Sequence, residues 1–176
     1  MRLTFAIQFL LLVLIFEKVH ANTIFIAMDE TQANHLKAYG IAYWSIEQGV
    51  EVDWLLNYKG GSFMMDYFQK IENELIIRGV SYNIISDAQQ LQIINEIANP
   101  SSNTDVMKLE KAPKIAVYSP KSALPWDDAV TLVLPYAEIP YDVIFDDELI
   151  YDELPRYAWL HLHPEDFSGQ FGKFED

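Results

Sequence analysis

The chain has 176 residues, of which 51% are hydrophobic and 22% charged, a composition typical of a folded domain with a full core. Asp and Glu number 26 against 12 for Lys and Arg, and the net charge of −14 argues against a nucleic-acid partner. The absence of cysteine excludes thiolate nucleophiles, cysteine-bound metal sites and disulfide bonds.

Residues 1–21 have the pattern of a secretory signal peptide. Arg2 precedes an apolar run from Phe5 to Phe16, and Ala21 puts a small residue at the expected cleavage position. The run is shorter than the roughly 20 apolar residues that a membrane-spanning helix needs. We therefore expect cleavage after Ala21, a periplasmic or secreted product, and no stable membrane span after cleavage. An uncleaved anchor is the alternative.

The next segment, 22–98, alternates between strand and helix periodicity. Strands are predicted at 23–28, 50–56 and 80–85, and helices at 31–48, 64–77 and 88–98. Local signals agree, since Gly49 and Gly79 stand where the first two helices would end and Asp87 stands where the third begins. This first block therefore has alternating strands and helices.

The polar segment 99–112 is predicted to be a surface linker to a second block, 113–163. That block has predicted strands at 114–118, 141–145 and 157–163, with helices at 126–136 and 147–154. Alternation of this kind favours one α/β domain, 22–176, with a mostly parallel sheet and helices on both faces, as in flavodoxin-like folds. Only 13 residues follow the last strand, so the sheet could be incomplete at the C-terminus and the sequence a fragment of a longer protein.

A histidine and carboxylate cluster follows the last predicted strand and is a candidate site for a divalent metal. His161 and His163 would point to one face of the strand, and Glu165 and Asp166 follow closely. Two imidazoles and a carboxylate could hold a zinc or iron ion that keeps positions open for water. The alternative is that the imidazoles only hydrogen-bond neighbouring loops.

A glycine pair gives a second candidate site, for a small polar or anionic ligand. Gly60 and Gly61 lie between Lys59 and Ser62, at a predicted turn from a strand into a helix that begins near Met64. Backbone amides at a helix N-terminus bind anions. The alternative is a tight turn that simply needs two glycines. In a parallel sheet this turn and the histidines would share the carboxyl edge and could form one pocket.

Other polar and aromatic residues have simpler interpretations. Asp127 and Asp128 precede a predicted helix, where acidic side chains interact favourably with the helix dipole. The aromatic residues of the first block are expected in the core or on a partner surface rather than on a sugar platform, namely Tyr39, Tyr43, Trp44 and Trp54.

Four phrases of the sequence resemble a family of exported bacterial proteins that usually carry the label asparagine synthetase B. These phrases are His35 to Gly40, Trp54 to Phe63, Arg78 to Tyr82 and His161 to Gln170. The resemblance implies a class I glutamine-amidotransferase-like α/β fold, of which this chain would be the N-terminal portion, with a C-terminal domain as partner. His163-Pro164 departs from the family pattern, in which a second histidine before the glutamate is expected, and this counts against a metal site.

Glutamine-dependent asparagine synthesis does not fit the residues. Such an enzyme resembles an N-terminal-cysteine amidohydrolase joined to an ATP-binding Ser-Gly-Gly-x-Asp-Ser loop. This chain has no cysteine, and its Gly60-Gly61-Ser62 sequence lacks the aspartate. Two functions therefore remain open: a non-catalytic module that binds a small ligand or a partner domain, and a metal-dependent hydrolase that uses His161, His163 and Glu165.

Overall fold

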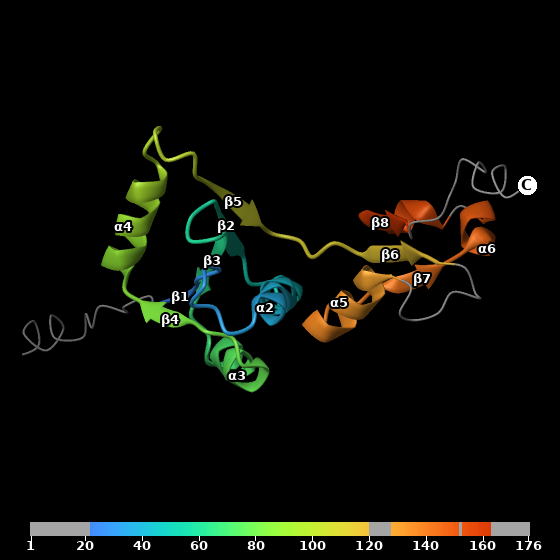
Figure 1. Cartoon of the computed structure of the whole chain (residues 1–176), viewed down its shortest axis with the longest axis horizontal. Coiled ribbons are helices and arrows are strands. Elements are labelled where there is room, and N and C mark those ends of the chain that lie inside the picture. Colours follow the sequence, from blue (N-terminus) through green and yellow to red (C-terminus); the bar gives the residue numbers. More distant parts are fainter. Residues whose placement is uncertain (1–21, 120–127, 152, 163–176) are drawn as a thin grey trace, which may run out of the picture.

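A computed structural model of the chain describes residues 22–119, 128–151 and 153–162, and it contains two β-sheets joined by an extended segment (Figure 1). We call residues 22–109 the first lobe and the described residues of 115–162 the second lobe. The predicted signal segment lies outside the described residues.

The first lobe contains a five-stranded antiparallel sheet with strand order β4-β1-β3-β2-β5. Its strands are β1 (Thr23–Ile26), β2 (Val52–Leu56), β3 (Ser62–Asp66), β4 (Asn83–Ile85) and β5 (Asp105–Leu109). Its helices are α2 (His35–Glu47), α3 (Gln69–Arg78) and α4 (Asp87–Ile97). The expected fold, one mostly parallel sheet of the flavodoxin type, is therefore wrong, because the larger of the two sheets is antiparallel.

Two segments account for the antiparallel arrangement. The helix predicted at 64–77 begins only at Gln69, because residues 62–66 form β3 and pair with β2 across a tight loop. Phe63, Met64 and Met65 are all buried, and a short run of consecutive apolar residues fits a strand covered on both faces as well as a helix. In addition, the segment expected to be a surface linker, 99–112, contains β5, which pairs with β2.

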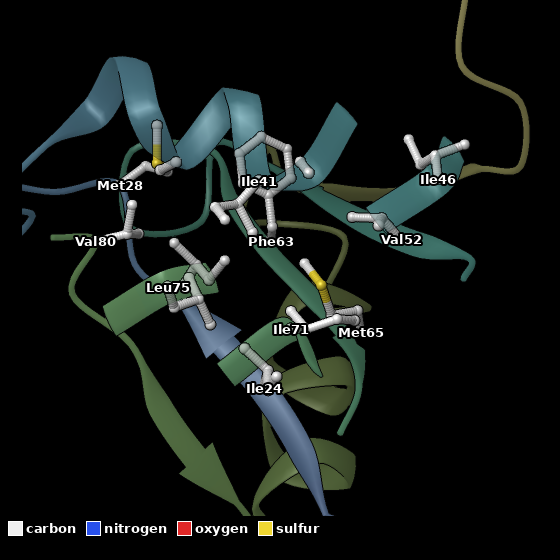
Figure 2. Close-up of a cluster of buried hydrophobic side chains, with 13 residues drawn as sticks. Ile24, Met28, Ile41, Ile46, Val52, Phe63, Met65, Ile71, Leu75 and Val80 are labelled. Carbon is white, nitrogen blue, oxygen red and sulfur yellow. The ribbon is translucent and has the colours of Figure 1, made fainter. Parts of the chain in front are cut away.

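Helices cover both faces of this sheet. Residues of α2 and α3 pack on one face, in a buried cluster that includes Ile24, Ile41, Phe63, Ile71 and Leu75 (Figure 2). On the opposite face, α4 packs against a smaller cluster formed by Phe25, Leu55, Met64, Ile85 and Ile97. The alternating side chains of β3 thus contribute to two separate cores.

The second lobe is a three-stranded parallel sheet with strand order β7-β6-β8, as the alternating pattern of this block predicted. Its elements are β6 (Ile115–Tyr118), α5 (Ala129–Ala137), β7 (Asp142–Ile144), α6 (Asp146–Ile150), the 3-10 helix η1 (Leu154–Arg156) and β8 (Trp159–Leu162). Ile115, Val117 and Leu134 form its buried centre, with Tyr43 of α2 packed against them.

Helices α2 and α5 join the two lobes. Glu138, directly after α5, pairs with Lys37 of α2 at 2.5 Å and with Arg78 of α3 at 3.2 Å. The Tyr43 hydroxyl donates a hydrogen bond to the Pro113 carbonyl oxygen at 2.9 Å. Polar and apolar contacts together therefore fix the second lobe against α2.

Within the described residues, no helix combines the length and the apolar character that crossing a bilayer would require.

Candidate functional site

A pocket of about 390 Å³ lies where the two lobes meet, and we call it the junction pocket. Its walls come from α2, β2, β3, the segment from β5 to β6, the residue after Glu138, and β8. The residues that line it are Tyr39, Ala42, Tyr43, Ile46, Trp54, Phe63, Leu109, Lys111, Pro113, Ile115, Ile139 and Trp159. Most of these side chains are apolar or aromatic, so the pocket favours an apolar ligand.

Aromatic rings pack against one another to form one wall of the pocket. Phe63 stacks on Trp54 with ring centres 6.4 Å apart, and Tyr39 meets the Phe63 ring edge-on at 5.5 Å. The Trp54 Nε1–H donates to the Gly61 carbonyl oxygen at 3.2 Å, which satisfies the polar end of that ring. This wall is therefore held in place before any ligand arrives.

Tyr43 lines the pocket and contributes a neutral phenol. Burial raises the pKa of its hydroxyl, and the negative charge of Glu47 raises it further. The hydroxyl is already engaged with the Pro113 carbonyl oxygen. Tyr43 therefore offers its ring rather than a charge to the pocket.

His161 contacts the carboxylate of Asp128, for which only a position at a helix N-terminus was expected. Its Nε2 lies 3.0 Å from Oδ2 of Asp128, a buried residue whose Oδ1 accepts the Val130 N–H at 2.8 Å. Asp128 is the N-cap of α5, so its expected place at a helix N-terminus is confirmed. Its pairing with His161 was missed, because it depends on β8 lying beside β6.

The other members of the expected metal cluster, His163, Glu165 and Asp166, lie outside the described residues, as does Asp127. Among the residues that are described, no group of three or more metal-binding side chains comes together. What the structure places is the His161–Asp128 pair, which also fits the simpler expectation of a hydrogen-bonded imidazole.

The glycine pair lies in the hairpin loop between β2 and β3, not before a helix. The helix N-terminus that would have supplied amides to an anion is therefore absent at this position. Gly60 has a φ of 82°, and a Cβ there would lie 2.2 Å from the Met28 carbonyl oxygen. The need for glycine thus comes from the turn and from its close approach to Met28.

The two residues that flank the pair are engaged within the fold. The Ser62 hydroxyl is buried and donates to the carbonyl oxygens of Tyr58 at 2.9 Å and Lys59 at 3.1 Å. The Lys59 ammonium lies 5.8 Å from the centre of the Phe25 ring. His161 and the glycine pair belong to different sheets, so the single parallel-sheet edge on which they were expected to meet does not exist.

Comparisons of the chain with protein-family models, with curated proteins and with solved structures found no match.

Proposed function

We propose that the chain is a non-catalytic binding module that holds a small, largely apolar molecule in the junction pocket. The observation that carries this proposal is the pocket itself, about 390 Å³ in size and lined by aromatic side chains from both lobes. Small-molecule sites are commonly concave, apolar and located between domains. The ion pairs and hydrogen bonds around α2 and α5 support it, because a prearranged pocket loses little entropy on binding.

The experiment compares two half-exposed residues of β8. Trp159 lines the pocket and Leu162 does not, although both lie on the same strand with similar exposure. Isothermal titration calorimetry with anilinonaphthalene sulfonate should show one site, which Trp159→Ala weakens about tenfold or more and Leu162→Ala leaves unchanged. Equal affinities for the two variants, or no binding to the unsubstituted protein, would contradict the proposal.

We also propose that the protein is exported. Residues 1–21 support this with a basic start, a short apolar run and Ala21 at the cleavage position. The proposal agrees with the resemblance to exported proteins labelled asparagine synthetase B, and it includes no asparagine synthesis because cysteine is absent. N-terminal sequencing of the exported product should begin at Asn22, whereas a product that begins at Met1 in the cytoplasm would exclude export.

A second candidate function is metal-assisted hydrolysis at His161. The hydrogen bond to Asp128 favours it, because a carboxylate behind an imidazole commonly orients a metal ligand. If Nε2 donates to the carboxylate, Nδ1 of the neutral ring keeps the lone pair that a metal needs. A bound zinc ion would lower the pKa of its water to about 7.

Zinc titration by calorimetry tests this candidate. Asp128→Asn should weaken zinc binding about 10-fold to 100-fold and His161→Ala should abolish it, while Asp142→Asn, at an exposed carboxylate on β7, should have no effect. Absence of stoichiometric zinc binding would leave the His161–Asp128 pair with a purely structural role.

A further inference from the structure

One basic side chain at the junction pocket is exceptional within the described part of the chain. Most of the described basic residues form ion pairs with carboxylates, namely Lys37, Arg78, Lys108, Lys114 and Arg156. Lys70 and Lys59 lie over aromatic rings. Lys111 lines the pocket and has no ion pair, hydrogen bond or ring contact among the described residues.

An unpaired ammonium is unexpected in a chain with this charge balance. Acidic residues exceed basic ones by 26 to 12, so carboxylates are abundant. Lys111 is nevertheless exposed beside an apolar pocket, where its charge is available to a bound molecule. A charge in this position favours a ligand that carries a complementary negative group next to an apolar body.

Tyr39 adds a second polar group to the lining of the pocket. Its ring packs edge-on against Phe63, while its hydroxyl has no hydrogen-bond partner among the described residues. A phenol can donate a hydrogen bond to a carboxylate oxygen. Tyr39 and Lys111 are thus the two lining residues with uncommitted donor groups, because the Tyr43 and Trp54 donors are already engaged.

We infer that the junction pocket binds an amphipathic carboxylate, with its apolar body among the aromatic side chains and its carboxylate at Lys111 and Tyr39. This inference rests on the proposed binding function and names the class of ligand. The net charge of the protein repels anions at long range, so the preference for a carboxylate must come from these near contacts.

The test uses three probes with the same alkyl chain and different head groups: decanoate, decanol and decyltrimethylammonium. Calorimetry on the purified protein should give the tightest binding for decanoate. Lys111→Met keeps most of the apolar stem and should weaken decanoate about fivefold, with little change for decanol. Tyr39→Phe should weaken decanoate by about the same factor. Lys108→Met, at the exposed lysine of β5 paired with Glu51, is the matched control and should change neither affinity.

The outcomes separate this inference from the function on which it rests. Equal binding of decanoate and decanol, or tightest binding of the cationic probe, would overturn the carboxylate inference and leave an apolar binding module. An unchanged decanoate affinity in Lys111→Met, with circular dichroism confirming a folded variant, would also overturn it. Failure of all three probes to bind would count against the proposed function itself, as would a negative result in the anilinonaphthalene sulfonate experiment.

Discussion

Gly40 of α2 lies so close to Ala137 of α5 that a Cβ at position 40 would be 1.8 Å from the Ala137 carbonyl oxygen. A hydrogen at this position is what allows the two helix backbones to approach each other. The contact also places Glu138 within reach of Lys37, one turn earlier on α2. Packing between the lobes therefore depends on the smallest side chain in α2.

We predict that Gly40→Ala destabilises the protein by about 1–3 kcal/mol. The new methyl group would clash with backbone atoms of Ala137, which cannot rotate away as a flexible side chain can. The expected sign is opposite to the usual effect of this substitution within a helix, where alanine is favoured by up to about 1 kcal/mol. Urea denaturation followed by tryptophan fluorescence measures the difference. A stabilised variant would show that α2 and α5 are not in contact.

The Glu138 carboxylate should make stability depend on pH. The hydrogen bond from Lys37 and the nearby charge of Arg78 lower its pKa below the ordinary value of 4.5. A lowered pKa in the folded state contributes stability that is present above the unfolded-state value and is lost as the pH falls through the folded-state value.

Glu138→Gln should therefore be less stable than the unsubstituted protein at pH 7, and the difference should shrink below about pH 4.5. Chemical denaturation at pH 7 and again below about pH 4.5 checks this. Thr131→Ser, on α5 away from these ion pairs, should keep the pH dependence of the unsubstituted protein. If the difference in free energy of unfolding between Glu138→Gln and the unsubstituted protein does not vary with pH, the Glu138 carboxylate is not the cause of the pH dependence.

The two glycines of the β2–β3 loop should respond unequally to substitution by alanine. Both have positive φ angles, 82° for Gly60 and 88° for Gly61, so each substitution costs about 1–2 kcal/mol from the backbone alone. Gly60→Ala also brings a Cβ to 2.2 Å from the Met28 carbonyl oxygen, whereas at Gly61 the nearest atom is Trp54 Nε1 at 3.3 Å. Thermal denaturation should show Gly60→Ala to be the less stable variant, and the reverse order would contradict the described loop.

Two buried serines provide a matched pair. The Ser45 hydroxyl of α2 is buried without a hydrogen-bond partner in the described part of the chain, whereas the Ser62 hydroxyl has two carbonyl acceptors. We predict that Ser45→Ala is neutral or stabilising by up to about 1 kcal/mol and that Ser62→Ala loses about 1 kcal/mol. Denaturation curves of the two variants measure this, and equal losses would indicate that Ser45 has a hydrogen-bond partner.

The sequence predicted the second lobe well because its elements are short and separated by clear breaks. Asp128 begins α5, and the β6, β7 and β8 strands follow the expected alternation with helices. In the first lobe, the apolar run at Phe63 to Met65 fitted two kinds of element, and only its pairing with β2 decides between them. Strand β5 was missed because most of it is exposed and polar residues interrupt its apolar pattern.

The candidate site was harder to predict than the fold. Trp54 and Tyr43 are partly buried against the hydrophobic clusters and Tyr39 is exposed, but nothing in the spacing of these three residues indicates that they line one pocket with Trp159. That arrangement arises from the way the lobes meet, which involves residues about a hundred positions apart. Likewise, the His161–Asp128 contact requires β8 to pair with β6 rather than with another strand.

The order of pairing along the chain has a consequence for how the protein folds. All five strands of the antiparallel sheet lie before residue 110, and all three strands of the parallel sheet lie after residue 114. A chain synthesised from its N-terminus can therefore complete the first lobe before any partner from the second has appeared. During that interval the surface of α2 around Gly40 and Tyr43 is not yet covered by the second lobe. This is the surface against which α5 and β6 pack once they have been synthesised.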